Sequence, residues 1–172
     1  MTGTGNTSGD ERIVAAQVGR IPRGPWRAAA RCSFGYPSVI VSPPLLADGT
    51  PFPTWAWLTC PHLRDVCAAE ESAGSVSRWA ERLASDVNLA AQMLAADAAL
   101  RAARAAEGPD PHPEYGLAGQ SDPLATKCLH AHVALALAGI ADPVGMSIIE
   151  TFGGQCADGR CARLAPAGEG VA

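Results

Sequence analysis

The sequence lacks the features that define several large protein classes. No window reaches the roughly 18 consecutive apolar residues that a membrane-spanning helix requires, and the best candidate, Val133–Ile140, is far too short. The first ten residues contain neither a basic segment nor an apolar one, so we expect no secretory signal there. We therefore expect a soluble cytoplasmic protein without a membrane span.

Basic residues are also scarce. Thirteen Lys and Arg stand against 17 Asp and Glu, which gives a net charge of −4 and a pI near 5.5. Proteins that bind nucleic acid usually present a basic stripe, and the local cluster found here comprises only the arginines at 20, 23, 27 and 31. Nucleic acid is therefore not an expected partner, and the sequence identifies no other partner or oligomeric state.

No complete catalytic or nucleotide-binding signature occurs. The chain has no P-loop, no dinucleotide-binding glycine fingerprint, no His-Glu-x-x-His and no Gly-x-Ser-x-Gly. It also has no Cys-x-x-Cys pair, which argues against thioredoxin-like redox chemistry and zinc knuckles. Cysteines are nevertheless present, and in a cytoplasmic chain they indicate thiols or ligands before disulfides: Cys32, Cys60, Cys67, Cys128, Cys156 and Cys161.

The composition predicts one folded domain. Apolar residues make up 48% of the 172 residues, which is enough for a single core. Residues 1–9 are rich in Gly, Thr and Ser and are expected to be a disordered tail. Residues 154–172 are expected to be a flexible tail that carries Cys156 and Cys161. The domain itself is expected to span residues 10–153.

The order of turn signals and apolar patterns predicts an α+β fold. Residues 26–32, 38–41 and 55–59 are expected to form a small antiparallel sheet of about three strands, separated by turns rich in Pro and Gly. Helix-start signals follow: Pro61 at a first helical position, and Asp86, Asp122 and Asp142 as N-caps, the last two each followed by a proline. They predict four or five helices packed against the sheet, over residues 62–72, 75–85, 87–106, 123–139 and 143–152, with a short helix before the sheet over 11–18.

The densest group of metal-ligand side chains is the segment Lys127–His132, which contains one cysteine and two histidines. On the helix predicted for residues 123–139, Cys128 and His132 are one turn apart and lie on the same side. His130 lies on the opposite side of that helix. A helix here therefore predicts that Cys128 and His132 share a ligand sphere, and that His130 does not easily join them.

Two further cysteines can complete this set. Cys60 is predicted to end a strand just before a helix, where the positive helix end favours a thiolate, and Cys32 ends the first predicted strand. Thiolate and imidazole together suit zinc, and thiolates suit iron–sulfur clusters. The leading hypothesis is a zinc ion or an iron–sulfur cluster with a structural or redox role, bound by Cys32, Cys60, Cys128 and His132.

Two other hypotheses stay open beside it. In one, Cys128 or Cys60 is the nucleophile of an enzyme and a nearby histidine is its base. In the other, the protein binds no metal and holds a partner on an exposed apolar surface, as a scaffold does. Cys67 is expected to pack in the core, and Cys156 and Cys161 fit either tail thiols or an extra ligand pair.

Five segments of the chain carry a recognisable pattern: Cys32-Ser-Phe-Gly-Tyr-Pro37, Pro43-Pro-Leu-Leu46, Asp48-Gly-Thr-Pro-Phe-Pro-Thr-Trp-Ala-Trp-Leu-Thr-Cys-Pro61, Lys127-Cys-Leu-His-Ala-His132 and Asp142-Pro-Val-Gly145. The pattern resembles the bacterial family called domain of unknown function 501, over roughly residues 12–150. In that family an Asn-Pro pair is common where Asp142 stands. The resemblance implies no established activity, but its signature falls on Cys32, Cys60, Cys128, His130 and His132.

Overall fold

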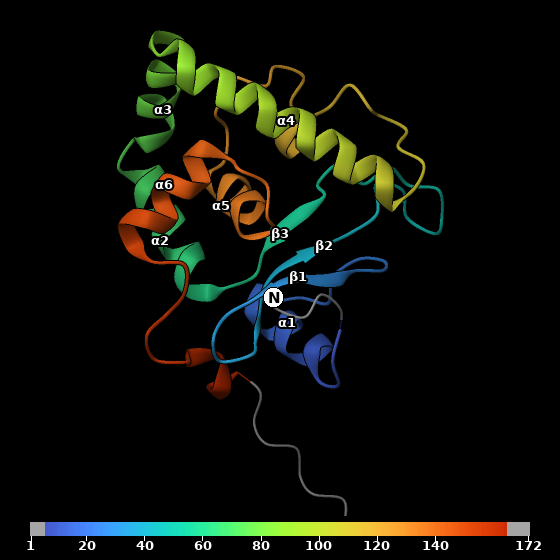
Figure 1. Ribbon diagram of the computed structural model, residues 1–172. Helices are drawn as coiled ribbons and strands as arrows, with labels where there is room; N and C mark the ends of the chain where they lie inside the picture. The colour runs from blue at the N-terminus through green and yellow to red at the C-terminus, as the bar shows by residue number, and fades with distance from the viewer. Residues whose placement is uncertain (1–5, 165–172) are drawn as a thin grey trace, which may run out of the picture.

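The three predicted strands form one antiparallel sheet in the computed structural model, which describes residues 6–164 (Figure 1). The strands are β1 (Arg27–Arg31), β2 (Pro37–Val41) and β3 (Ala56–Leu58), in the spatial order β1-β2-β3. Residues 1–5 and 165–172, which belong to the two expected tails, lie outside the described residues.

Helices surround this sheet. α5 lies in the middle of the molecule, where it contacts β3, α2 and α6, and α4 crosses above it in the view of Figure 1. The predicted α+β domain with a small three-stranded sheet is confirmed. The six α-helices of the described residues are α1 (Asp10–Val18), α2 (Pro61–Ser72), α3 (Ser75–Ser85), α4 (Val87–Glu107), α5 (Leu129–Leu137) and α6 (Pro143–Phe152).

Packing on both faces of the sheet buries every residue of β2. Successive side chains of a strand point to opposite faces, so Val39 and Val41 share one face and Ile40 lies on the other. Val39 and Val41 belong to the main core together with Leu129 and Val133 of α5. The opposite face of β2 contacts α1. The short apolar strand is therefore the centre of two packed layers.

Two helices begin at the aspartates that the sequence identifies as N-caps. The Asp86 carboxylate accepts hydrogen bonds from the Asn88 and Leu89 N–H groups, at 2.9 and 3.1 Å, and α4 follows. The Asp142 carboxylate accepts the Gly145 N–H at 2.8 Å at the start of α6. Both caps are local interactions, which is why the sequence alone predicts them.

The helix after Cys128 begins later than predicted. α5 starts at Leu129 rather than just after Asp122, and Cys128 is its N-cap in an extended conformation, with φ −147° and ψ 112°. Upstream, Asp122 accepts the Leu124 N–H at 2.9 Å, which makes a turn instead of a helix. The Leu129 N–H donates to a Glu71 carboxylate oxygen at 2.7 Å. This contact with α2 satisfies the free N–H at the start of α5, and so Cys128 lies outside the helix.

The chain after α6 packs back onto the domain as far as the described residues extend. Cys156 and Cys161, which the sequence places in a flexible tail, are only 4% and 3% exposed. A short 3₁₀ helix, η2 (Arg160–Arg163), follows Asp158. The Asp158 carboxylate accepts hydrogen bonds from the side chains of Arg160 and Arg163. The described part of the expected tail therefore belongs to the folded domain.

A close approach of two backbones joins α5 to α6. A Cβ atom added to Gly145 would lie 2.1 Å from the His132 carbonyl oxygen and 2.9 Å from the Ala136 Cβ. Both near neighbours belong to α5, and the oxygen is a backbone atom that cannot rotate away. Only glycine allows the two helices to pack at this distance.

Replacing this glycine tests the helix contact. Gly145→Ala is expected to lower the free energy of unfolding by about 3 kcal/mol, because α6 must move away from α5. Gly154→Ala is the matched control, since its Cβ would meet no atom closer than 3.4 Å, and it should change stability by less than about 0.5 kcal/mol. Urea denaturation followed by circular dichroism measures both. Equal unfolding midpoints for the two variants would contradict the packing described here.

Candidate functional site

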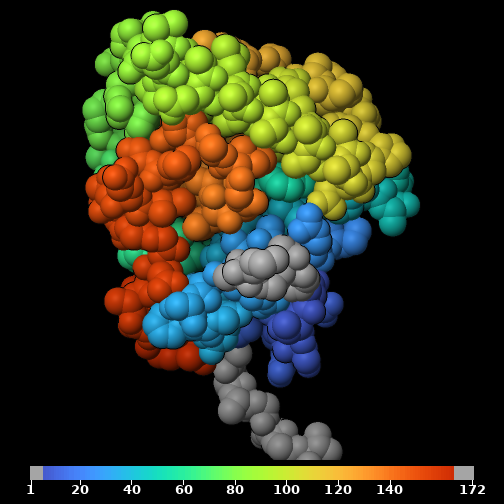
Figure 2. All heavy atoms as spheres, in the orientation of Figure 1, coloured from blue at the N-terminus to red at the C-terminus, as the bar shows by residue number. Residues whose placement is uncertain are grey.

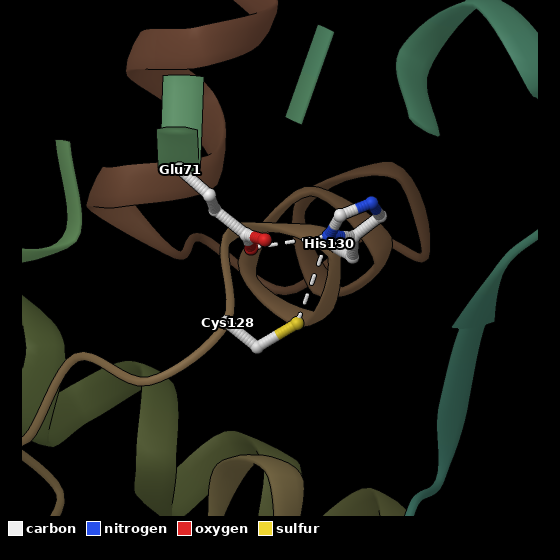
Figure 3. A group of neighbouring side chains, drawn as sticks. All are labelled: Glu71, Cys128 and His130. Atoms are coloured by element: carbon white, nitrogen blue, oxygen red, sulfur yellow. Dashed lines mark hydrogen bonds and ion pairs between the residues drawn. The ribbon is translucent and has the colours of Figure 1, made fainter. Parts of the chain in front are cut away.

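Glu71, Cys128 and His130 bring three metal-ligand side chains to one point (Figure 3). The His130 Nδ1 atom lies 3.1 Å from Glu71 Oε1 and 3.8 Å from Cys128 Sγ. The three ligand atoms lie within 4.8 Å of one another, and within residues 6–164 no other trio of His, Cys, Asp or Glu meets this condition. The group is half-buried and joins the end of α2 to the start of α5.

Backbone geometry at the start of α5 fixes this arrangement. Cys128 is the N-cap and His130 lies in the first turn, so both side chains project from the same end of the helix. Glu71 reaches them from the last turn of α2, and its Oε1 also accepts the Leu129 N–H. The hydrogen bond that caps the start of α5 therefore also holds the Glu71 carboxylate in place. The site is therefore built into the α2–α5 contact.

The electrostatic surroundings of His130 favour a charged imidazole. The Cys128 thiol raises the pKa of His130, and the Glu71 carboxylate raises it further, although burial acts in the opposite direction. With a proton on Nδ1, the ring bridges the carboxylate and the sulfur. Without that proton, the carboxylate, thiolate and imidazole are three electron-pair donors directed at the same region, which is the chemistry of a metal site.

A cavity of about 350 Å³ adjoins this group. Cys128 and His130 both line it, and so do Ile40 and Trp57 from one face of the sheet and Leu58 from the other. Since β3 pairs only with β2, the cavity runs around the free edge of β3. A small molecule in this space would contact apolar walls and the thiol and imidazole together.

Three arginines also line the cavity: Arg20, Arg23 and Arg64. The Arg20 guanidinium lies 5.7 Å from the centre of the Trp57 ring, in a cation–π arrangement, and Arg64 donates to the backbone carbonyl of Gln17. Guanidinium groups recognise carboxylates and phosphates. The cavity therefore suits a small anionic molecule with an apolar part.

His132, a predicted ligand, makes a structural contact instead. Its Nδ1 atom lies 2.8 Å from the Asp142 carboxylate, and both side chains are almost completely buried. The other oxygen of the same carboxylate caps α6 through the Gly145 N–H. Cys128 is the extended N-cap of α5, and although its carbonyl accepts the His132 N–H, its sulfur lies 3.8 Å from His130 Nδ1. The two side chains that the sequence pairs have different partners here: Asp142 for His132, and His130 for Cys128.

Cys60 and Cys32 also lie away from Cys128. Cys60 is the N-cap of α2, whereas Glu71 lies in the last turn of the same helix. Eleven residues at 1.5 Å each separate these positions by about 16 Å. Cys32 follows β1 at the β1–β2 turn, where its N–H donates to the Tyr36 carbonyl. The structure does not assemble the four predicted ligands into one group.

Glu71 is the member of the trio that the sequence does not indicate. It lies 57 residues before Cys128 in a helix with several other charged side chains, and nothing in its neighbourhood marks it as a ligand. The contribution of His130, in contrast, follows from the Cys-x-His spacing once the helix is known to begin at Leu129. An N-cap and the second residue of the helix can point to the same side, whereas two residues inside a helix at that spacing cannot.

Comparison with protein families places this site in a known group. The model of a family described as a protein of unknown function (DUF501) matches residues 28–150. The chain belongs to this family. The matched region contains Glu71, Cys128 and His130, and also Cys32 and Cys60. No curated protein and no solved structure matches the chain. No helix among the described residues is both long and apolar enough to cross a membrane.

The role of Asp142 can be tested through folding stability. Asp142→Ala is expected to lower the free energy of unfolding by about 2–4 kcal/mol, because it removes a helix cap and leaves a buried imidazole without a partner. Asp142→Asn keeps an oxygen for the Gly145 N–H and an amide for His132, so its loss should be less than half as large. Urea denaturation distinguishes the two. An alanine variant as stable as the asparagine variant would contradict a structural Asp142–His132 pair.

Proposed function

We propose that the protein binds a zinc ion through Glu71, Cys128 and His130, and that it acts on a small anionic molecule held in the adjoining cavity. The observation that carries this proposal is the meeting of three different zinc-ligand side chains within 4.8 Å, next to a cavity that two of them line. Zinc accepts carboxylate, thiolate and imidazole ligands, and catalytic zinc sites use three protein ligands and keep a fourth position for water or substrate.

The distances within the trio suit one ion. Ligand bonds of about 2.0–2.3 Å in a tetrahedral arrangement require ligand atoms roughly 3.3–3.8 Å apart. His130 Nδ1 lies 3.1 Å from the Glu71 oxygen and 3.8 Å from the Cys128 sulfur, so only small side-chain movements are needed. The hydrogen bond from the Leu129 N–H orients the Glu71 carboxylate, as hydrogen bonds to zinc ligands commonly do.

The cavity supports a catalytic rather than a purely structural site. Structural zinc sites usually have four protein ligands, whereas the trio leaves a position free. Zinc in such a position supplies a Lewis acid that polarises a carbonyl or phosphoryl oxygen. The residues of this chain would orient the substrate: Arg20, Arg23 and Arg64 by charge, and Trp57 by apolar contact.

Zinc binding is the first test. Wild-type protein, treated with a chelator and then titrated with Zn²⁺ by calorimetry, is expected to bind one zinc at the trio. His130→Gln and Glu71→Gln should each weaken this binding about tenfold or more, since even the loss of a supporting hydrogen bond costs 10–100-fold. His62→Gln is the matched control, because His62 lies outside the trio, and it should bind as the wild type does. Unchanged affinity in His130→Gln would overturn the proposal.

A second candidate is supported by the same Cys128–His130 contact. A cysteine at the N-terminus of a helix, 3.8 Å from an imidazole, resembles the nucleophile and base of a thiol-dependent enzyme. In this case the pair acts without a metal: His130 Nδ1 takes the thiol proton, and the Glu71 carboxylate, which contacts the same nitrogen, stabilises the imidazolium that results.

Alkylation with iodoacetamide distinguishes the two candidates. In metal-free protein, Cys128 is expected to react faster than the fully buried Cys67, because Cys128 borders the cavity. If the site binds zinc, one equivalent of Zn²⁺ should slow the alkylation of Cys128 about tenfold or more in wild-type protein, and not in His130→Gln. Mass spectrometry of peptides gives the rates. Fast alkylation that zinc does not change would favour the thiol enzyme over the zinc site.

A further inference from the structure

Four cysteines outside the trio gather at the opposite end of α2. Cys32 lies at the start of the β1–β2 turn, Cys60 is the N-cap of α2, and Cys156 and Cys161 lie in the segment after α6. In Figure 2 the atoms of the β1–β2 turn, drawn in light blue, lie directly against those of the C-terminal segment, drawn in red. Three parts of the chain that are far apart in sequence therefore meet here.

Hydrogen bonds join the segment of Cys32 to that of Cys156. The Ser33 N–H donates to the Gln155 side-chain oxygen at 2.7 Å, and the Gln155 amide donates to the Ser33 hydroxyl at 2.7 Å. Cys32 and Cys156 are each adjacent in sequence to one of these two residues, Ser33 and Gln155. The Phe34 ring also covers Gly159, where an added Cβ would lie 3.0 Å from a ring carbon.

A second set of contacts joins Cys161 to Cys60. The Gln17 side-chain amide donates to Cys161 Sγ at 3.2 Å and to the Pro37 carbonyl at 2.8 Å. Thr59, next to Cys60, donates its hydroxyl to the same Pro37 carbonyl at 3.1 Å. Gln17 and Thr59 therefore bring the two cysteines to the same end of β2.

The charges of these thiols influence one another. Burial raises the pKa of Cys60, and Cys161 and Cys156 raise it further. Burial likewise raises the pKa of Cys161, to which Cys32 and Cys156 add. None of the four is in a disulfide. Three of the four, Cys60, Cys156 and Cys161, are buried, and Cys32 is half-buried.

We propose that Cys32, Cys60, Cys156 and Cys161 are the ligands of an iron–sulfur cluster. Four cysteine thiolates are the usual ligand set of two-iron and four-iron clusters, and the hydrogen-bonded segments described above supply four cysteines at one place. The ligand set keeps Cys32 and Cys60 from the sequence hypothesis and replaces Cys128 and His132 with the two cysteines of the C-terminal segment.

The four sulfur atoms do not converge on the position of one ion. Four thiolates on one zinc ion are about 3.8 Å apart, as Zn–S bonds of about 2.3 Å require. Within residues 6–164 no three of these four cysteines have their sulfur atoms within 4.8 Å of one another. A cluster does not require such convergence, because its thiolates bind different iron atoms and surround several metal atoms and the sulfides between them.

Hydrogen-bond donors and positive groups surround the same sulfur atoms. The positive N-terminal end of α2 lies at Cys60, which is its N-cap. Gln17 donates to Cys161, and Arg160 lies close enough to Cys156 to interact with its charge. Arg31 interacts in the same way with the charge of Cys32. Donors to cluster sulfurs stabilise the negative charge of the bound cluster and set its potential.

Anaerobic reconstitution tests this inference. The full chain is treated with a chelator and incubated with Fe³⁺, a thiol reductant and sulfide without oxygen, and excess iron is removed. About two or four iron atoms per chain and the visible absorption of an iron–sulfur cluster are expected, according to cluster type. Cys156→Ser and Cys161→Ser should each lose most of the iron and colour. Both follow the last α-helix, so the helical circular dichroism signal should remain and report that they are folded.

Two further variants separate this site from the zinc site. Cys128→Ser and His130→Gln should keep the iron and the colour, whereas Cys60→Ser should lose them and keep zinc binding at the trio. A wild-type protein that stays colourless and free of iron would overturn the inference. So would a colourless protein with one zinc ion bound by these four cysteines, or a cluster that survives both Cys156→Ser and Cys161→Ser.

Discussion

The hydrogen bond from the Leu129 N–H to the Glu71 carboxylate determines much of this structure. It satisfies a free donor at the start of α5, and it comes from α2 rather than from the neighbouring sequence. As a result Cys128 lies outside the helix, beside His130, and the carboxylate that caps the helix also faces their side chains. The Glu71 carboxylate therefore connects α2 to α5, caps the start of α5, and forms a group of three possible metal ligands with Cys128 and His130.

The fold could be predicted from the sequence because its signals are local. Turn residues separate the three strands. Asp86 and Asp142 mark helix starts through hydrogen bonds within three residues, and Pro61 does so through its fixed φ at a first helical position. The start of α5 could not be predicted in this way. Asp122 and Pro123 make a good local start signal, but the chain turns there instead, and a carboxylate from a distant helix caps Leu129.

The grouping of the candidate ligand residues also depends on contacts between distant segments, which local sequence signals do not reveal. The sequence identifies Cys32, Cys60 and Cys128 as candidate metal ligands, but it does not determine which of them lie close together in the fold. That grouping depends on α2, which separates Cys60 from Glu71 by about 16 Å, and on the segment after α6 folding back through Gln155 and Gln17. Helical spacing predicts that His132 is a ligand, whereas Asp142, the N-cap of the next helix, holds it in the core.

The position of Cys156 and Cys161 has a consequence for biosynthesis. Cys32 and Cys60 emerge from the ribosome early, with the sheet that carries them, while the other two thiols follow after all six α-helices of the described chain. Until Cys161 has been synthesised, Cys32 and Cys60 lack the segment that packs against them in the folded chain. A cofactor at this place would therefore be inserted after translation has passed the domain, and its insertion would fasten the end of the chain to its beginning.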